Sequence, residues 1–315
     1  MAGVPFERAG IAAWPSRAMW DAAALGLVGD MLERWNLTAG EVFDVGFAAS
    51  VLRVAQADGS PAVLKVGYPH VESQYEAVAL DAYGPGLAPA LLRQDAWTWS
   101  MLLEPVEPGT SLASSALPTD AAIAEACAVH ARVVACRVPP GIPRLDDQLG
   151  MFAGQARDRL RGDRSSLDGM GGATLVERAL DDLEALLADD VPEGFLHGDF
   201  NPGNLLRATG GWRVIDPNPL VGDPAFDLWP LLTQVGDPLG ARGATERGGL
   251  AVDVAALEHA VALAASLTGY NARRITRWAF ARTGLNLSWY LQDGEEKLAA
   301  LELEALDAWR RLAGY

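Results

Sequence analysis

The strongest chemical signal in the chain lies in eight residues, His197-Gly198-Asp199-Phe200-Asn201-Pro202-Gly203-Asn204. Asp199 and Asn204 are five positions apart, a spacing typical of the catalytic loop of phosphoryl-transfer enzymes. In such a loop the carboxylate accepts or orients the proton of an attacking hydroxyl, and the amide oxygen binds magnesium. Pro202 and Gly203 favour a tight turn over a helix between the two polar residues.

The residues after Asn204 predict a β-hairpin, with strands at 205–208 and 212–215. A hairpin of this length places Asn204 and Asp216 near each other at its open end. One amide oxygen and one carboxylate there suit Mg²⁺, which completes its shell with nucleotide phosphates. The alternative is an ordinary hairpin with polar surface residues, because Asp, Asn and Gly are common in turns. The joint occurrence of the two carboxylates and the amide at these offsets favours the catalytic interpretation.

Lys65 is the second candidate, because it lies among apolar residues in the strand Ala62-Val63-Leu64-Lys65-Val66. A lysine there can neutralise nucleotide phosphates, provided that a carboxylate holds it in place. The helix that follows offers Glu72 and Glu76, and we prefer Glu76 because it lies in the apolar-periodic part of that helix. The alternative is an edge-strand lysine that faces solvent.

The turn before the lysine strand, Val45-Gly46-Phe47-Ala48-Ala49-Ser50-Val51, is expected to cover the phosphates. Its small residues let the backbone approach a ligand, and Ser50 is a hydrogen-bond donor. The segment has one glycine where phosphate-binding loops of the G-x-G-x-x-G type have three. Read alone, it is equally consistent with a plain hairpin turn.

Two further polar side chains favour structural roles. Asp223 before Pro224 is typical of a helix N-cap with proline in the first turn, so Asp227 falls one turn into a helix. There we expect Asp227 to brace the catalytic loop through backbone N–H groups rather than to touch substrate. His130 lies among apolar residues at helical spacing, which favours a hydrogen-bonded core histidine over a catalytic one.

The order of elements predicts an α+β fold with two lobes. Residues 1–104 form a small β-rich lobe with helices at 16–35 and 70–83 and strands at 41–46, 50–56, 61–67, 90–94 and 98–104. Asp58-Gly59 marks a tight hairpin between two of these strands. Residues 105–315 form a mostly helical lobe, reached through a Pro- and Gly-containing linker at 104–109. Its helices are expected at 120–136, 146–161, 173–189, 224–233, 252–267, 273–292 and 295–312.

The charge of the chain bears on its partners. Of 315 residues, 41 are acidic and 25 are Lys or Arg, giving a formal net charge of -16. Nucleic-acid binding proteins usually present a basic face, so this class is disfavoured. The acidity suits a cationic substrate, although carboxylates that only keep the protein soluble are the simpler explanation. The chain has two cysteines, no leading apolar run and no uncharged stretch long enough to span a bilayer. We therefore expect a cytoplasmic protein without membrane contact.

Together these residues resemble the aminoglycoside phosphotransferases. Five segments occur in the same order as in those enzymes: Leu64-Lys65-Val66, Leu102-Leu103-Glu104-Pro105, the stretch from His197 to Asn204, Val214-Ile215-Asp216-Pro217 and Gly222-Asp223-Pro224-Ala225-Phe226-Asp227. His-Gly-Asp, where protein kinases have His-Arg-Asp, is typical of that branch. Ala279-Phe280-Ala281-Arg282 and Ser288-Trp289-Tyr290-Leu291-Gln292-Asp293-Gly294 are similar to the streptomycin 6-phosphotransferase and hydroxyurea phosphotransferase group.

The resemblance implies a protein-kinase-like fold, ATP or GTP as phosphate donor, Mg²⁺, and a hydroxyl of a small, often cationic sugar as acceptor. Asp199 is then the catalytic base, Asn204 and Asp216 are the magnesium ligands, and Lys65 with Glu76 positions the nucleotide. The segment from Glu104 to Val106 is the hinge that reads the base through backbone groups. Asp216-Pro217-Asn218 replaces the Asp-Phe-Gly of protein kinases, which questions a protein-kinase-type switch but not metal binding.

Three functions follow from these residues as hypotheses. The leading hypothesis is a kinase that phosphorylates streptomycin-like aminoglycosides, acting as a monomer or homodimer. The alternatives are a metabolic kinase of an amino sugar or another metabolite, and a non-catalytic nucleotide-binding module. The acceptor pocket is expected between the catalytic loop and the C-terminal helices, with a lining drawn from Trp229, Asn286, Trp289 and Asp293. The aromatic residues among these are more simply explained as core.

Overall fold

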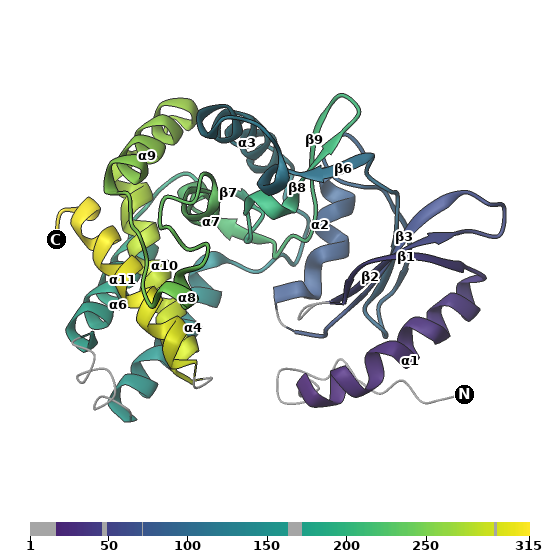
Figure 1. Ribbon diagram of the computed structural model, residues 1–315, viewed down its shortest axis with the longest axis horizontal. Coiled ribbons are helices and arrows are strands. Elements are labelled where there is room, and N and C mark those ends of the chain that lie inside the picture. The colour runs from purple at the N-terminus through teal and green to yellow at the C-terminus, as the bar shows by residue number, and fades with distance from the viewer. Residues whose placement is uncertain (1–16, 46–48, 71, 163–171, 293–294) are drawn as a thin grey trace. The chain divides into compact units, whose positions relative to one another are not determined.

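The computed structural model describes residues 17–45, 49–70, 72–162, 172–292 and 295–315, which divide into two compact units. The first unit comprises Met1–Thr110 and Leu206–Pro219, and the second comprises Ser111–Leu205 and Leu220–Tyr315. The first is small and β-rich and the second is larger and mostly helical (Figure 1), so the predicted α+β organisation is confirmed. The division differs from the boundary expected at residue 104, because Leu206–Pro219 returns to the first unit.

The first unit is built on a five-stranded antiparallel sheet in the order β1-β2-β3-β5-β4. Its strands are β1 (Thr38–Val45), β2 (Ala49–Ala55), β3 (Pro61–Gly67), β4 (Leu91–Asp95) and β5 (Ser100–Leu103). The predicted hairpin joins β2 to β3, and Gly59 in its turn has φ +82°, a conformation that glycine adopts without strain. Strand β3 lies between β2 and β5, so both of its backbone edges are paired with a neighbouring strand.

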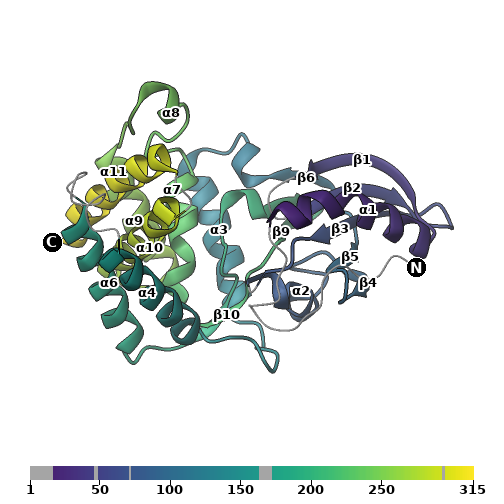
Figure 2. The same ribbon diagram turned by 90° about the horizontal axis from the view of Figure 1, so that it is seen from below.

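Helices cover both faces of this sheet (Figures 1 and 2). Helix α1 (Arg17–Trp35) buries Trp20, Leu27 and Met31 against Leu64 and other apolar side chains of β2, β3 and β5. Because side chains alternate along a strand, the neighbouring Lys65 faces the other side, toward α2 (Glu76–Tyr83). The helix expected at 70–83 is regular only from Glu76 on, since a 3-10 turn, η2 (Glu72–Tyr75), precedes it.

A second, three-stranded sheet attaches the hairpin to the first unit. Its order is β6 (Pro108–Ser111), β8 (Leu205–Ala208) and β9 (Gly211–Val214). Two backbone bonds support it, from Thr209 N to Glu107 O (3.1 Å) and from Val214 N to Leu87 O (2.8 Å). The expected linker at 104–109 therefore ends in a strand, because the distant hairpin supplies hydrogen-bond partners for its backbone.

The second unit is organised around helix α10 (Ala272–Gln292), which packs against helices α4, α6, α7, α9 and α11. The bounds of the remaining helices are α3 (Thr119–Val134), α4 (Leu145–Gly162), α6 (Ala173–Ala188), α7 (Leu228–Gln234), α8 (Ala244–Arg247), α9 (Val254–Thr268) and α11 (Glu296–Ala313). Ile275, Trp278 and Phe280 of α10 are at most 1% exposed, as expected of a central helix. Among the described residues, no helix combines the length and apolar character needed to cross a bilayer.

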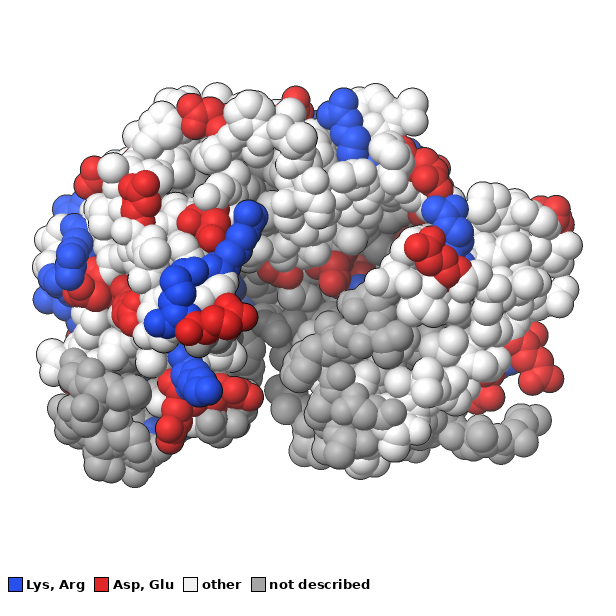
Figure 3. All heavy atoms as spheres, in the orientation of Figure 1, with Lys and Arg blue, Asp and Glu red and all other residues white. Residues whose placement is uncertain are grey.

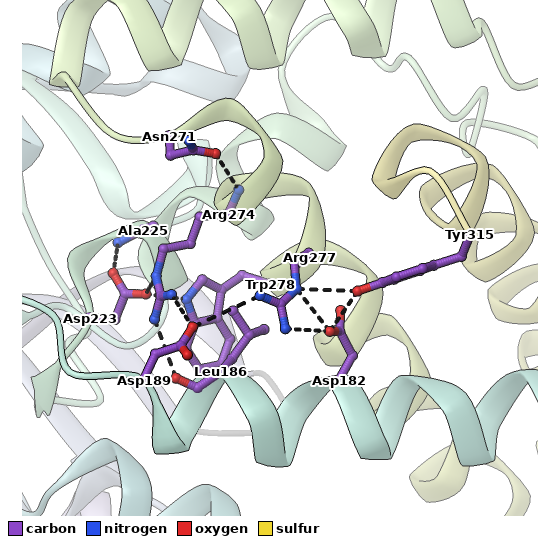
Figure 4. Close-up of polar contacts among 10 residues, drawn as sticks. All are labelled: Asp182, Leu186, Asp189, Asp223, Ala225, Asn271, Arg274, Arg277, Trp278 and Tyr315. Atoms are coloured by element: carbon purple, nitrogen blue, oxygen red, sulfur yellow. Dashed lines mark hydrogen bonds and ion pairs between the residues drawn. The ribbon is translucent and has the colours of Figure 1, made fainter.

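A short segment between a small sheet and α7 is anchored on α10. The sheet pairs β7 (Gly194–Leu196) with β10 (Leu220–Gly222), and the 3-10 turn η5 (Pro224–Asp227) follows. Asp223 caps η5 by accepting from Ala225 N, as predicted, and also accepts from the Arg274 guanidinium and the Trp278 indole of α10 (Figure 4). Because η5 ends at Asp227, this network fixes the position of that carboxylate.

Candidate functional site

Asp199 and Asn204 are brought together by the turn that their spacing predicted. Asn201 caps the 3-10 turn η4 (Pro202–Asn204), because its Oδ1 accepts from the backbone N–H groups of Gly203 (2.8 Å) and Asn204 (3.1 Å). The side-chain Nδ2 of Asn204 then donates to Oδ2 of Asp199 at 2.9 Å and to its backbone carbonyl at 3.0 Å. The amide therefore orients the carboxylate.

Asp227 braces this loop through hydrogen bonds to its backbone. Its Oδ2 accepts from His197 N and its Oδ1 from Gly198 N, both at 2.8 Å, and the residue is 1% exposed. These are the backbone contacts expected of a bracing residue. Burial alone would raise the pKa of Asp227, but contact with His130 and the neighbouring His197 lowers it below its ordinary value. The brace is therefore a carboxylate at neutral pH.

Lys65, Glu76 and Asp216 form a second cluster, within the first unit. Nζ of Lys65 lies 2.6 Å from Oε1 of Glu76 and also contacts Oδ1 of Asp216, which follows β9. Lys65 is 7% exposed in the middle of the sheet, so the solvent-facing interpretation of this lysine is wrong. Asp216 has φ +59°, a left-handed conformation that is uncommon for non-glycine residues and is enriched at functional sites.

The cluster has one ammonium for two carboxylates. Burial opposes the charge of Lys65, but Glu76 and Asp216 outweigh it and raise the pKa of the ammonium. Burial, reinforced by Asp216, raises the pKa of Glu76 to about 7 in spite of the attraction of Lys65. We take the lysine as charged, and Glu76 as the group of the cluster that exchanges its proton near neutral pH.

The predicted magnesium ligands have the right donor chemistry. Both side-chain bonds of Asn204 are made by its Nδ2, and no described residue bonds its Oδ1. With the carboxylate of Asp216, this offers two hard oxygen donors, the number that Mg²⁺ takes from a protein when phosphates complete its shell. Asn204 belongs to the second unit and Asp216 to the first, so their convergence on one ion stays a prediction.

The remaining nucleotide candidates lie in the first unit. Ser50 is 6% exposed at the start of β2, opposite Val66, whereas positions 46–48 of the expected phosphate turn lie outside the described residues. The carboxylate of Glu104 accepts from Arg213 at 2.8 Å, and its backbone N–H donates to Ala90 O at 2.9 Å. Base recognition by this segment would therefore use the carbonyl of Glu104 or the backbone of half-buried Val106.

The predicted acceptor residues make contacts within the helical unit. Trp229 donates through Nε1 to Thr283 at 3.1 Å, and the ring of Trp289 stacks edge-on against Phe152. Such contacts are typical of aromatic residues in a protein core, so they give no evidence that either ring binds a ligand. Asp293 lies outside the described residues.

Asn286, the fourth acceptor candidate, has a partner that the sequence reasoning missed. Its side chain interacts with Glu302 of α11, and burial raises the pKa of that carboxyl to about 7 although the interaction with Asn286 lowers it. The helical spacing of Glu302 from the buried Ala299 and Leu306 was the available signal, because it places the carboxyl on the inner face of α11.

Comparisons with known proteins identify the family. The model of the aminoglycoside/hydroxyurea antibiotic resistance kinase family matches residues 34–294. A streptomycin 6-kinase of Streptomyces glaucescens is 31% identical over 300 residues, covering 94% of this chain and 91% of the relative. A hydroxyurea phosphotransferase of Kitasatospora aureofaciens is 32% identical over 300 residues, covering 92% and 79%.

A solved structure supports the fold. It is an aminoglycoside phosphotransferase in ternary complex with AMP-PNP and hygromycin B, which aligns with a TM-score of 0.61 and 17% identity over 91% of this chain and 98% of the other. This likeness confirms the protein-kinase-like fold that the sequence predicted. The family model spans most of the chain and includes Lys65, Glu76, Asp199, Asn204 and Asp216. The chain therefore belongs to the aminoglycoside/hydroxyurea antibiotic resistance kinases.

Proposed function

We propose that this kinase transfers the γ-phosphoryl group of ATP or GTP to a hydroxyl of a streptomycin-like aminoglycoside. The observation that carries the proposal is the hydrogen bond of Asn204 to Asp199, in a loop braced by Asp227, within a chain of this family. The bond engages Oδ2 of Asp199, and among the described residues no donor contacts Oδ1. That oxygen is the one to accept the proton of the attacking hydroxyl.

The other residues receive roles that follow from their charges. Lys65, held by Glu76 and Asp216, neutralises nucleotide phosphates. Asn204 and Asp216 would hold Mg²⁺, which when bound offsets the charge that develops on the transferred phosphoryl group. The backbone between Glu104 and Val106 would recognise the base. Trp229, Asn286, Trp289 and Asp293 remain candidates for the acceptor pocket.

The acceptor is tested by a panel. Purified protein with Mg²⁺ and ATP or GTP is supplied with streptomycin, hydroxyurea and an amino sugar, and nucleoside diphosphate release and the phosphorylated product are measured. Hydroxyurea is the second candidate acceptor, because the relative of that name is 32% identical. Phosphorylation of streptomycin supports the proposal, and turnover confined to another acceptor would contradict it.

The catalytic role is tested by Asp199→Ala. We expect its turnover to fall about 10²–10⁴-fold, the usual contribution of a general base, while a fluorescent nucleotide analogue binds as in the wild type. Asp190→Ala, at an exposed position on the same unit, is the matched control and should keep full activity. An Asp199→Ala enzyme with wild-type turnover would rule out this mechanism.

A further inference from the structure

His130 of α3 is buried beside the brace of the catalytic loop. The residue is 0% exposed, and its Nε2 lies 3.6 Å from Oδ2 of Asp227. The ring also packs edge-on against Phe200 of the catalytic loop, at 5.2 Å between centroids, and against Tyr270, at 5.9 Å. The predicted burial is therefore correct, but the predicted hydrogen bonding is not. Within the described part of the chain, neither ring nitrogen has a partner at hydrogen-bond distance.

Two unpaired nitrogens are costly in such a place. Buried polar groups are normally hydrogen-bonded, and an apolar ring of the same size would fill this space without the penalty. A separation of 3.6 Å exceeds a hydrogen bond by roughly half an ångström, and bonds at catalytic sites often tighten only when substrate is bound. The imidazole is thus one small movement away from donating to Asp227.

The contact between His130 and Asp227 lies close to Asp199, the proposed base, along the chain of hydrogen bonds. Oδ2 of Asp227, which faces His130, also accepts from His197 N, and the other oxygen accepts from Gly198 N, the residue before Asp199. Phe200, the residue after Asp199, packs edge-on against the His130 ring. His130 therefore supports the backbone both before and after the proposed base.

We propose that His130 is a positioning residue for phosphoryl transfer. Its Nε2–H closes the 3.6 Å separation to donate to Asp227, and its ring supports Phe200. Together these contacts fix the backbone that carries Asp199. The proposal rests on Asp199 being the base of the proposed function. Because His130 acts on the loop rather than on a ligand, its loss lowers kcat and leaves both KM values unchanged.

Two substitutions separate the nitrogen from the ring. His130→Phe keeps an aromatic ring against Phe200 and Tyr270 but removes the donor. His130→Gln keeps an amide N–H at a similar reach but removes the ring. Val133→Ala, at another buried position of α3, is the matched control for a loss of stability alone. Steady-state kinetics are measured with whichever acceptor of the panel the wild type phosphorylates best.

We expect kcat of His130→Phe to fall about ten- to a hundredfold, the loss typical of a displaced catalytic group. KM for nucleotide and acceptor should stay within about twofold of the wild type. His130→Gln should recover much of kcat, and Val133→Ala should keep it. Wild-type kcat in His130→Phe, or an equal loss of kcat in Val133→Ala, would overturn the proposal.

Hydrogen exchange gives a readout that needs no acceptor. We expect the amide of Gly198 to exchange faster in His130→Phe than in the wild type and Val133→Ala, because the Asp227 brace loosens. If the wild type phosphorylates no acceptor, the proposed function fails, whereas the exchange comparison still decides whether His130 holds the loop. Unchanged exchange at Gly198 in His130→Phe contradicts the positioning role.

Discussion

Lys65 is bound by two carboxylates of very different exposure. The side chain of Glu76 is 5% exposed and that of Asp216 is 42% exposed. Solvent screens the exposed carboxylate, so the buried one dominates the orientation of the ammonium. The affinity for the nucleotide should therefore depend on the protonation state of Glu76, because a neutral Glu76 no longer holds the Lys65 ammonium by charge.

This argument predicts a pH dependence of nucleotide binding. The pKa of Glu76 is raised to about 7, so the carboxylate is ionised above that pH and gains a proton below it. KM for the nucleotide should rise as the pH falls from about 8 to about 6, where roughly 90% of Glu76 is protonated. Glu76→Gln should show a raised KM that no longer changes in this range. Exposed Glu125→Gln should keep the wild-type profile, and a similar profile in Glu76→Gln would contradict the assignment.

The same pKa has a consequence for stability, with the opposite sign. A group with a raised pKa in the folded state contributes stability that is fully present below its unfolded pKa, about 4.5, and is lost as the pH rises through about 7. Glu76 should therefore lower the free energy of unfolding as the pH rises across this window. In urea titrations at a series of pH values, Glu76→Gln should remove this part of the pH dependence of the free energy of unfolding.

At this scale the sequence predicted contacts that are local. Asp199 and Asn204 share one turn, and Lys65 and Glu76 lie on a strand and the helix that follows it, so spacing and alternation were sufficient. The contact of Lys65 with Asp216 joins residues 151 positions apart. That contact, like the proximity of His130 to Asp227, depends on how distant elements pack, and a single sequence carries no direct signal for it.

Among the elements, α6 and α10 are packed unusually closely. A Cβ added at Gly284 of α10 would lie 2.4 Å from the Cβ of Ala179 on α6, far inside van der Waals contact. A side chain there forces two buried helices apart, because neither neighbour is flexible. Gly154 of α4 offers the contrast, since it is exposed and nothing lies within 4 Å of an added Cβ.

One substitution in these two places should have opposite effects. Gly284→Ala should lower the free energy of unfolding by about 1–3 kcal/mol through overpacking. Gly154→Ala should raise it by about 0.5–1 kcal/mol, because alanine has the higher helix propensity and loses less entropy on folding. Urea unfolding followed by circular dichroism measures both. A stabilised Gly284→Ala protein would show that the helices are free to move apart.

The anchor of η5 gives a second comparison between elements. Arg274 binds two carboxylates, Asp223, which is 8% exposed, and Asp189, whose side chain is 47% exposed. Asp223→Asn should cost about 3 kcal/mol, because it leaves a largely buried guanidinium with only the exposed Asp189 as its charged partner. Asp189→Asn should cost at most about 1 kcal/mol, as exposed pairs do. Equal losses in urea unfolding would mean that Asp223 is not the anchor.

The elements themselves were predicted more fully than their partners. Periodicity and turn residues located the main helices and the strands of the five-stranded sheet, because each pattern arises within one segment. They did not reveal β6 in the expected linker, since its strand character comes from pairing with β8. For the same reason the hairpin that carries Asp216 was assigned to the wrong side of the boundary.

The whole molecule carries a formal net charge of -16, which has two explanations. The carboxylates either serve solubility alone or also attract a cationic acceptor. Figure 3 shows acidic side chains spread over the face drawn, interspersed with basic ones, so the distribution on that face does not decide between them. The two explanations differ in how acceptors of different charge respond to salt.

If the field of the protein attracts its acceptor, kcat/KM for streptomycin should fall several-fold between about 20 and 300 mM salt, because the screening length shortens to below 10 Å. For hydroxyurea, the neutral acceptor of the panel, kcat/KM should change little. Measuring both at saturating nucleotide and taking their ratio removes any effect of salt on the enzyme itself or on phosphate binding. A ratio that stays constant across the salt series would assign the acidity to solubility. A ratio that falls would mean that the charge of the whole chain helps to select a cationic substrate, a selection that the residues around Asp199 cannot make because they act on any hydroxyl.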